Sequence, residues 1–358
     1  MSFEVHQTAF DSMAQWHAWR LGLDLAPPRP EATAEEQAYR RFYGDFLADV
    51  CANGQAYGVF QAVYEDTIPE DKLREDRLRE ARQKARKAIE GGLVDFLFQI
   101  GRVANLRGNT LQIDRPFFDE LVAEKIKKAN VKGIPHAFER LGLSLGLNET
   151  AHVTISQYPG ASAGLAWLAK ACAALPEYGF YFFRRCDFGV LDGKRQPLFE
   201  DGFRLLPGDL AEQVRRTDEL LRERKFKHEL FVADGDGGYR VRYQKRKGNL
   251  AYWSRIRSWS SMALDHNLRW DFAGDLTPRL FERLDAAQPG LAGQVFQAIK
   301  KCTHCYTNCL VRKTITHHGE TQEICQETGW QMYGGSGQDF ENLRGAIVAL
   351  DELASQKK

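Results

Sequence analysis

The stretch KHELFVADGDGGYRVRYQKRKGNLAYWSRIRSW, residues 227–259, decides the fold class of this chain. It holds three short strand-like runs, KHELFVA, GYRVRYQKR and LAYWSRIRSW, which are joined by turns that contain glycine, and the second run alternates apolar and polar residues. Alternation with a period of two is typical of a half-buried strand, and short connections that contain glycine favour antiparallel hairpins. The stretch therefore predicts three consecutive strands, and MALDHNLRWDF, residues 262–272, is a candidate for a fourth.

Helices are predicted before these strands. Thr33 and Glu36 fit a capping box, in which the hydroxyl and the carboxylate each accept a backbone N–H at a helix start. The apolar residues that follow recur at helical spacing; they are Tyr39, Phe42, Phe46 and Val50. A second helix is expected from about Pro69 to Gly91-Gly92. Its run of mixed charge is interpreted as a solvated face with i,i+4 ion pairs rather than a binding arm.

The rest of the chain mixes the two patterns. Strands are expected at 110–113, 151–158 and 179–191, and helices after Pro116 and at 162–175, 209–225, 277–287, 291–300 and 339–354. Because hairpin-like strands follow one another between helices, the order indicates an α+β fold with antiparallel sheets rather than a regular βαβ array. We expect a helical N-terminal region at 1–108, an α+β unit at 109–205, an α+β unit with basic strands at 206–300, and a metal-binding hairpin with a terminal helix at 301–358.

The composition is that of a globular protein, since 43% of the 358 residues are hydrophobic and 27% are charged. The formal net charge of +1 neither favours nor excludes nucleic acid, so any basic footprint must be local. The N-terminus lacks the pattern of a secretory signal, and no apolar run reaches the roughly 18 residues of a membrane span. With an odd count of seven cysteines, these features predict a cytoplasmic protein that uses no membrane.

Four of the seven cysteines gather in KCTHCYTNCLVRKTITHHGETQEIC, residues 301–325. Cys302, Cys305 and Cys309 have the spacing C-x2-C-x3-C, and Cys325 follows after fifteen residues. The segments on either side of THHGE predict a β-hairpin with Gly319 in its turn. A cysteine knuckle followed by a return through a hairpin is a common form of small zinc site, and four thiolates complete the tetrahedral shell of Zn²⁺. The sequence therefore predicts zinc as a structural cofactor bound by these four cysteines.

Three alternatives to this zinc site stay open. His304, His317 or His318 could replace one of the thiols as a ligand. Four cysteines can also hold an iron–sulfur cluster. The last alternative is a set of four buried free thiols without a metal.

A second candidate site follows from the charge of the strands. Residues 239–259 contain seven arginines and lysines and no acid. If the alternating faces of two neighbouring strands coincide, guanidinium groups lie between indole rings, and such a surface suits the phosphates and bases of a single-stranded nucleic acid. The candidate residues are Arg240, Arg242, Trp253, Arg255, Arg257 and Trp259. The alternative is an edge strand protected by charge, with tryptophans that support the core.

The segment GASAG, residues 160–164, fits the motif G-x-S-x-G with Ser162 at its centre. Its place between a predicted strand and a predicted helix is the context of a nucleophile elbow. No HGGG-type oxyanion segment and no clear strand-end acid accompany it, and small residues at a helix start explain the motif without chemistry. A serine hydrolase is therefore the third hypothesis for function.

Three features together resemble a family of uncharacterised bacterial cytosolic proteins. They are Tyr158-Pro159 before a central helix, Cys186-Asp187-Phe188, and the four-cysteine tail. The resemblance covers about the last two-thirds of the chain. It implies no activity, and it implies that a helix after Tyr158-Pro159 is the shared feature rather than a nucleophile.

The first expectation for function is a non-enzymatic binding or interaction protein. The second is a protein that binds single-stranded nucleic acid through the arginines and tryptophans. The expected partner is a protein or a single-stranded nucleic acid.

Overall fold

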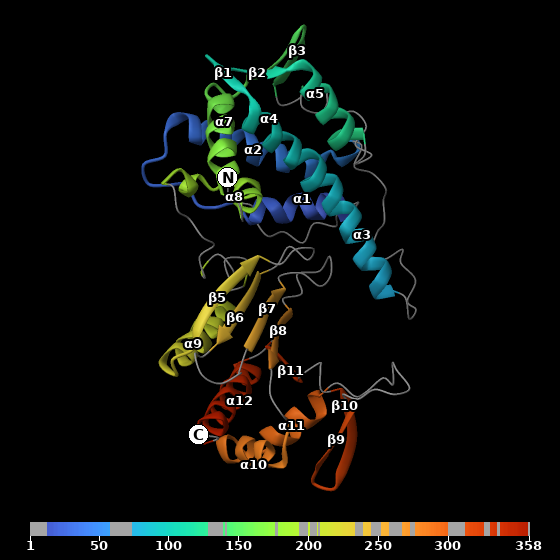
Figure 1. The fold of residues 1–358 in the computed structure, drawn as a ribbon, viewed down its shortest axis with the longest axis vertical. Helices are drawn as coiled ribbons and strands as arrows, with labels where there is room; N and C mark the ends of the chain where they lie inside the picture. Colours follow the sequence, from blue (N-terminus) through green and yellow to red (C-terminus); the bar gives the residue numbers. More distant parts are fainter. Residues whose placement is uncertain are drawn as a thin grey trace. The chain divides into compact units, whose positions relative to one another are not determined.

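The computed structural model describes residues 13–57, 74–127, 139, 142–175, 178–192, 200, 206, 208–232, 239–244, 252–257, 267–272, 276–299, 312–325, 330–334 and 337–356 (Figure 1). The chain forms two compact units, Met1–Gln196 and Pro197–Lys358, which we call unit 1 and unit 2. Helices dominate unit 1, and small antiparallel sheets occur in both units, which confirms the α+β class. The division into four segments is finer than these two units and stays a prediction. None of the helices in the described part of the chain combines the length and the apolar character that crossing a bilayer requires.

Unit 1 combines helices with one four-stranded antiparallel sheet. The α-helices are α1 (Met13–Leu23), α2 (Ala34–Ala52), α3 (Arg74–Ala88), α4 (Asp95–Val103), α5 (Arg115–Leu121), α7 (Ala161–Ala173) and α8 (Gly179–Arg184). Shorter turns are the 3-10 helices η1 (Gly54–Tyr57) and η5 (Phe188–Asp192) and the π-helices η3 (Ile89–Val94) and η4 (Val122–Lys127). The sheet has the order β1-β2-β4-β3, with β1 (Asn105–Arg107), β2 (Thr110–Asp114), β3 (Leu143–Leu147) and β4 (Thr150–Ile155).

The core of unit 1 forms where α7 packs on α2. The apolar residues predicted on one face of α2 are all fully buried; they are Tyr39, Phe42, Phe46 and Val50. The two helices approach closely at Gly164, because a Cβ atom there would lie 2.4 Å from the backbone oxygen of Glu35. A small residue at this position is therefore a condition of the packing.

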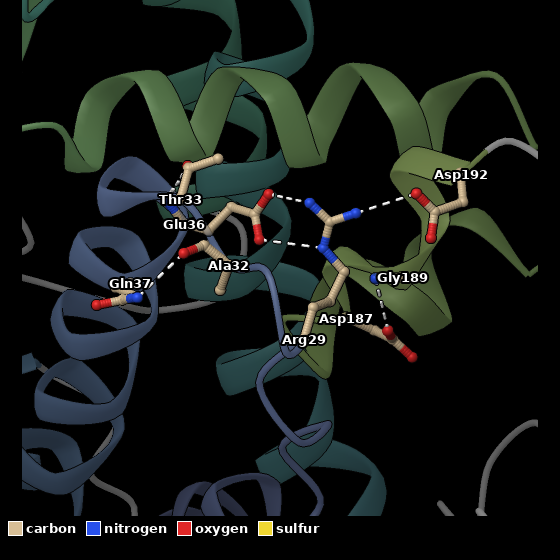
Figure 2. Close-up of polar contacts among 8 residues, drawn as sticks. All are labelled: Arg29, Ala32, Thr33, Glu36, Gln37, Asp187, Gly189 and Asp192. Atoms are coloured by element: carbon tan, nitrogen blue, oxygen red, sulfur yellow. Dashed lines mark hydrogen bonds and ion pairs between the residues drawn. The ribbon is translucent and has the colours of Figure 1, made fainter.

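The start of α2 confirms one half of the predicted capping box. Thr33 Oγ1 accepts the hydrogen bond of the Glu36 N–H at 3.3 Å. The Glu36 carboxylate has another partner, because both of its oxygens accept hydrogen bonds from the Arg29 guanidinium. Arg29 also reaches the Asp192 carboxylate at 3.1 Å, as Figure 2 shows. An ion pair with the loop before α2 thus replaces the reciprocal half of the capping box.

The predicted helix end at Gly91-Gly92 is wrong. The chain continues from α3 through the π-helix η3 into α4. Within η3 the Glu90 carboxylate is buried and binds His17 at 2.8 Å and Arg184 at 3.0 Å. Ile89, Leu93 and Val94 of the same segment are fully buried, and this apolar burial outweighs the roughly 1 kcal/mol that a glycine costs in a helix interior. The predicted helix start near Pro69 lies outside the described residues.

The strand predicted at 179–191 is also wrong, since this segment forms α8 and η5. Its aromatic run has high β-propensity, which packing readily overrides. In the helical form Arg184 and Arg185 are both buried, and their guanidinium groups reach the carboxylates of Glu90 and Asp24 at 3.0 and 3.4 Å. The helical form also buries Tyr181, Phe182 and Phe183 in the core, and this packing accounts for the helix.

Unit 2 contains a five-stranded antiparallel sheet, a separate hairpin and four described helices (Figure 1). The sheet order is β11-β8-β7-β6-β5, with β5 (Lys227–Val232), β6 (Tyr239–Gln244), β7 (Tyr252–Arg257), β8 (Asn267–Phe272) and β11 (Trp330–Gly334). The hairpin pairs β9 (Arg312–His317) with β10 (Glu320–Cys325). The helices are α9 (Gly208–Glu223), α10 (Pro278–Ala287), α11 (Leu291–Ala298) and α12 (Gly337–Gln356).

The four strands predicted at 227–272 are confirmed as β5 to β8, and each pairs with the next along the chain. The fifth strand, β11, was missed. It pairs with β8 across a long stretch of sequence that includes the β9–β10 hairpin. The strand is short and its partner is distant in the sequence, so the local sequence pattern hardly indicates it. Its pairing with β8 depends on tertiary contacts.

Candidate ligand-binding sheet face

The strand register of unit 2 brings basic positions into rows across the sheet. In the pairing of β6 with β7, Arg240 lies opposite Arg255 and Arg242 lies opposite Trp253. In the pairing of β7 with β8, Arg255 lies opposite Arg269. Directly paired positions belong to the same face of an antiparallel sheet. Arg240, Arg255 and Arg269 therefore form one row over three strands, which we call the arginine row.

The register also places the other residues predicted for this site. Arg257 lies two positions after Arg255 and so belongs to the same face. Trp259 lies outside the described residues. Arg269 was missed in the sequence, because membership of the row depends on the register of two hairpins; the alternation in NLRWDF was the available signal. The arginine face, as we use the term, consists of these positions: Arg240, Arg242, Trp253, Arg255, Arg257 and Arg269.

Aromatic and acidic positions accompany the arginines on this face. Phe231 pairs with Arg240, and Tyr333 pairs with Arg269, so aromatic positions stand at both ends of the arginine row. Glu229 pairs with Arg242, and Asp271 pairs with Trp253. These two acids lie in the neighbouring row, and the arginine row itself contains no acid.

The opposite face of the sheet belongs to the core of unit 2. Val241 and Tyr243 of β6 are buried. The Tyr243 hydroxyl donates a hydrogen bond to Asp218 of α9 at 3.1 Å, and His228 Nδ1 lies 2.8 Å from the same carboxylate oxygen. Burial, together with Asp218, raises the pKa of Tyr243 well above its ordinary value, so the hydroxyl keeps its proton and acts as donor. These contacts place α9 on the face away from the arginines.

Electrostatics makes the arginine row unusual. Residues directly opposite each other in an antiparallel sheet have Cβ atoms about 4.5–5.5 Å apart, and like charges at this spacing destabilise the pairing. Arginine stays protonated in proteins, so the charge cannot be relieved by deprotonation. Anions with several oxygens, such as phosphates, are bound by guanidinium groups through paired hydrogen bonds.

The cysteine cluster is only partly described. Cys302, Cys305 and Cys309 lie outside the described residues, and Cys325 is the last residue of β10, where it pairs with Arg312. The predicted hairpin is confirmed, with its turn at His318-Gly319.

The hairpin geometry bears on the histidine alternative for the fourth ligand. Between Cys325 and Glu320, the residue that pairs with His317, there are five register steps, or about 16 Å along the strand. A zinc ion lies within about 2.3 Å of each of its ligands. His317 and His318 are therefore too far along the hairpin to share a metal ion with Cys325.

The remaining thiols have no reactive character. Cys51, Cys172 and Cys186 are free cysteines. Burial raises the pKa of the Cys51 and Cys186 thiols to about 12. Since the thiolate is the form that binds metals and attacks electrophiles, these two residues are inert at neutral pH.

Ser162 has a structural environment. Its side chain is fully buried, and its Oγ accepts the hydrogen bond of the Ile155 N–H at 3.1 Å. Gly160 precedes α7 with a φ of 90°, a backbone angle that favours glycine. With the close approach at Gly164, these features explain Gly160, Ser162 and Gly164 by their structural roles and give no support to a nucleophile.

Comparison with known proteins gives no information about the function of this chain. No family model matches the chain, and neither the curated proteins nor the solved structures give a match. The resemblance to uncharacterised bacterial proteins thus stays an expectation and contributes nothing to function.

Proposed function

We propose that this chain is a non-enzymatic binding protein that holds single-stranded nucleic acid on its arginine face. The observation that carries the proposal is the arginine row, in which Arg240, Arg255 and Arg269 occupy directly paired positions on three strands. A phosphodiester backbone supplies anionic oxygens at regular intervals, and guanidinium groups bind such oxygens in pairs.

The aromatic positions favour a single strand over a duplex. Trp253 lies on the arginine face, and Phe231 and Tyr333 stand at the ends of the arginine row. Unpaired bases stack on aromatic side chains at about 1–3 kcal/mol per base, and stacking is possible only where the bases are exposed. Because the net charge of the chain is only +1, attraction to phosphates must come from a local basic surface such as this face, and it must weaken as salt is added.

The test measures the binding of fluorescent single-stranded oligonucleotides over a series of salt concentrations. Single Arg→Ala changes at Arg240, Arg255 and Arg269 should weaken binding and reduce the log–log salt slope by about 0.7 for each phosphate that the protein no longer neutralises. The matched control is Arg216→Ala, which removes an exposed arginine from α9 and should leave both quantities unchanged. Changing Arg255 and Arg257 together to Glu should abolish binding at low salt while the protein stays folded.

Two results would contradict the nucleic-acid proposal. One is a wild-type protein that binds no oligonucleotide even at low ionic strength, which would assign the arginine face to a protein partner. The other is an equal effect of Arg269→Ala and Arg216→Ala, which would reduce the binding to non-specific charge attraction.

We also propose that Cys302, Cys305, Cys309 and Cys325 bind one structural zinc ion. The hairpin that returns the chain to Cys325 supports this. His317 and His318 lie too far along the hairpin to join Cys325 at one ion, so either of them could act only in place of Cys325 and not beside it. Metal analysis of the purified chain should give zinc at this site, and visible absorbance would instead indicate an iron–sulfur cluster.

A further inference from the structure

The turn of the β9–β10 hairpin brings two histidines against an aspartate of α10. His317 ends β9, His318 stands in the turn, and Asp285 lies near the end of α10. One ligand atom from each of these three residues lies within 4.8 Å of the other two. The best-defined pair is His318 Nε2 and Asp285 Oδ2, which are 4.0 Å apart.

Asp285 is held in place by its other oxygen. Asp285 Oδ1 accepts the hydrogen bond of the Ala292 N–H at 3.1 Å, near the start of α11. This bond fixes the carboxylate and leaves Oδ2 on the side of His318. A carboxylate oriented by a hydrogen bond to its second oxygen is the usual arrangement of a metal ligand.

His317 is fixed by two aromatic rings. Its imidazole stacks on Phe281 with centroids 5.0 Å apart, and it contacts Phe296 at 5.6 Å. Its Nε2 atom is buried and has no hydrogen-bond partner among the described residues. A polar atom that is enclosed without a partner needs an explanation, and a missing ion is one of the accepted ones.

His318 occupies a position that favours another residue. His318 has a φ of 46° and Gly319 a φ of 84°, so the two-residue turn is of type I′. Asn-Gly or Asp-Gly is the preferred pair in such a turn, because the first residue must adopt the left-handed conformation. A histidine here holds its ring beside His317, with centroids 4.1 Å apart.

We infer that Asp285, His317 and His318 bind a divalent transition-metal cation of the zinc class. Two imidazoles and one carboxylate form a common ligand set for zinc, with ligand distances of about 2.0–2.2 Å. Tetrahedral coordination at these distances needs ligand atoms about 3.3 Å apart, so the ligand atoms must approach one another by up to about 1.5 Å. His318 is mostly exposed and can make this adjustment by side-chain rotation.

The bound cation ties the tip of the hairpin to the corner between α10 and α11 and leaves a coordination position for water. This site is separate from the four-cysteine site, because the turn and Cys325 are at opposite ends of the hairpin. The inference also stands apart from nucleic-acid binding, since none of its three ligands belongs to the arginine face.

The test titrates Zn²⁺ into the full chain, purified without a histidine tag, by calorimetry. His318→Asn preserves the turn, since Asn suits its conformation, and removes one ligand. Asp285→Asn keeps an acceptor for the Ala292 N–H and removes the charge. Each change should weaken binding at this site at least tenfold and leave the zinc held by the cysteines unchanged. His152→Asn, on β4 of unit 1, is the matched control and should titrate as wild type.

Hydrogen exchange gives a readout that does not depend on stoichiometry. Zn²⁺ should slow the exchange of the amides around the β9–β10 turn in the wild type and in His152→Asn, and should have no effect there in His318→Asn. The inference is overturned if the wild type takes up no Zn²⁺ beyond the amount bound by its thiols. It is equally overturned if His318→Asn and Asp285→Asn bind Zn²⁺ as tightly as the wild type.

Discussion

Glu90 connects the polar groups in the interior of unit 1. Its carboxylate binds His17 at 2.8 Å, Arg184 at 3.0 Å and Arg86 at 3.2 Å. Burial opposes its ionisation, but the neighbouring cations outweigh burial, and the pKa of Glu90 lies well below its ordinary value. Burial also lowers the pKa of His17, although Glu90 acts in the opposite direction. A buried pair of this kind contributes little net stability, but breaking it is costly because a charge is left alone.

These two pKa shifts predict that unit 1 loses stability in acid. Since the pKa of His17 falls below 6.5 on folding, the unfolded chain takes up a proton that the folded chain does not, and stability drops as the pH falls below about 6.5. The slope is at most about 1.4 kcal/mol per pH unit for one proton. Glu90 adds a second loss below its ordinary value of 4.5, where its carboxylate is ionised only in the folded state.

Urea unfolding of unit 1 between pH 7 and pH 5 measures the contribution of His17. His17→Gln keeps a donor for Glu90 and cannot titrate, so the free energy of unfolding should depend less on pH in this range than it does in the wild type. His152→Gln removes a histidine from β4 and should keep the wild-type dependence. A His17→Gln protein with the wild-type dependence would show that another group senses the acid.

At the scale of elements, unit 1 depends on how closely α7 approaches α2. A Cβ atom at position 164 would lie 2.4 Å from the Glu35 oxygen and 2.7 Å from Tyr39 Cβ. Neither neighbour is the end of a flexible side chain, so one of the two helices must shift. Overpacking of this kind costs about 1–3 kcal/mol.

Gly164→Ala should therefore destabilise unit 1 by about 1–3 kcal/mol. The matched control is Gly44→Ala in α2, where nothing lies within 4 Å of the added Cβ. This change should stabilise the helix by about 0.5–1 kcal/mol, because alanine is the better helix former. Thermal unfolding of both variants checks the prediction, and a harmless Gly164→Ala would mean that α7 and α2 are further apart than the structure places them.

Some features of these elements could be predicted from the sequence, and others could not. Short strand-like runs between glycine-containing turns predicted β5 to β8, and helical spacing predicted the buried face of α2, because both patterns are local consequences of which side meets the core. The register of a strand and the choice of its partner depend on tertiary contacts. The strand β11 and the place of Arg269 in the arginine row were therefore missed. The Asp285 group was missed for the same reason, since His317 comes 32 positions after Asp285 in the chain. The aromatic run of α8 was wrongly predicted as a strand, because packing overrides β-propensity.

At the scale of the whole molecule, the two units are stabilised by different means. Unit 1 has an aromatic core between α2 and α7 and a buried ionic cluster around Glu90. Unit 2 presents a sheet with one face on α9 and the other rich in arginine. Chains built from two compact units commonly depart from two-state unfolding, so one melting temperature does not describe them.

The proposed four-cysteine zinc site predicts that removal of metal affects the two units unequally. Structural zinc contributes to folding directly, by about 10 kcal/mol or more in small zinc-binding peptides, and all four cysteines belong to unit 2. A strong chelator should therefore lower the unfolding temperature of unit 2 and leave that of unit 1 unchanged. Differential scanning calorimetry should show this as two transitions, of which only one moves.

The Gly164→Ala variant assigns the transitions, because it should shift the one that belongs to unit 1. Asp285→Asn separates the two proposed metal sites: the chelator should still act on this variant through the thiolate-bound zinc. Changing Cys302, Cys305, Cys309 and Cys325 together to Ser should lower the unit 2 transition to the position reached with chelator. A quadruple variant with an unchanged unit 2 transition would show that the cysteines hold no structural metal, because loss of a closed thiolate site must be visible in the stability of the unit that contains it.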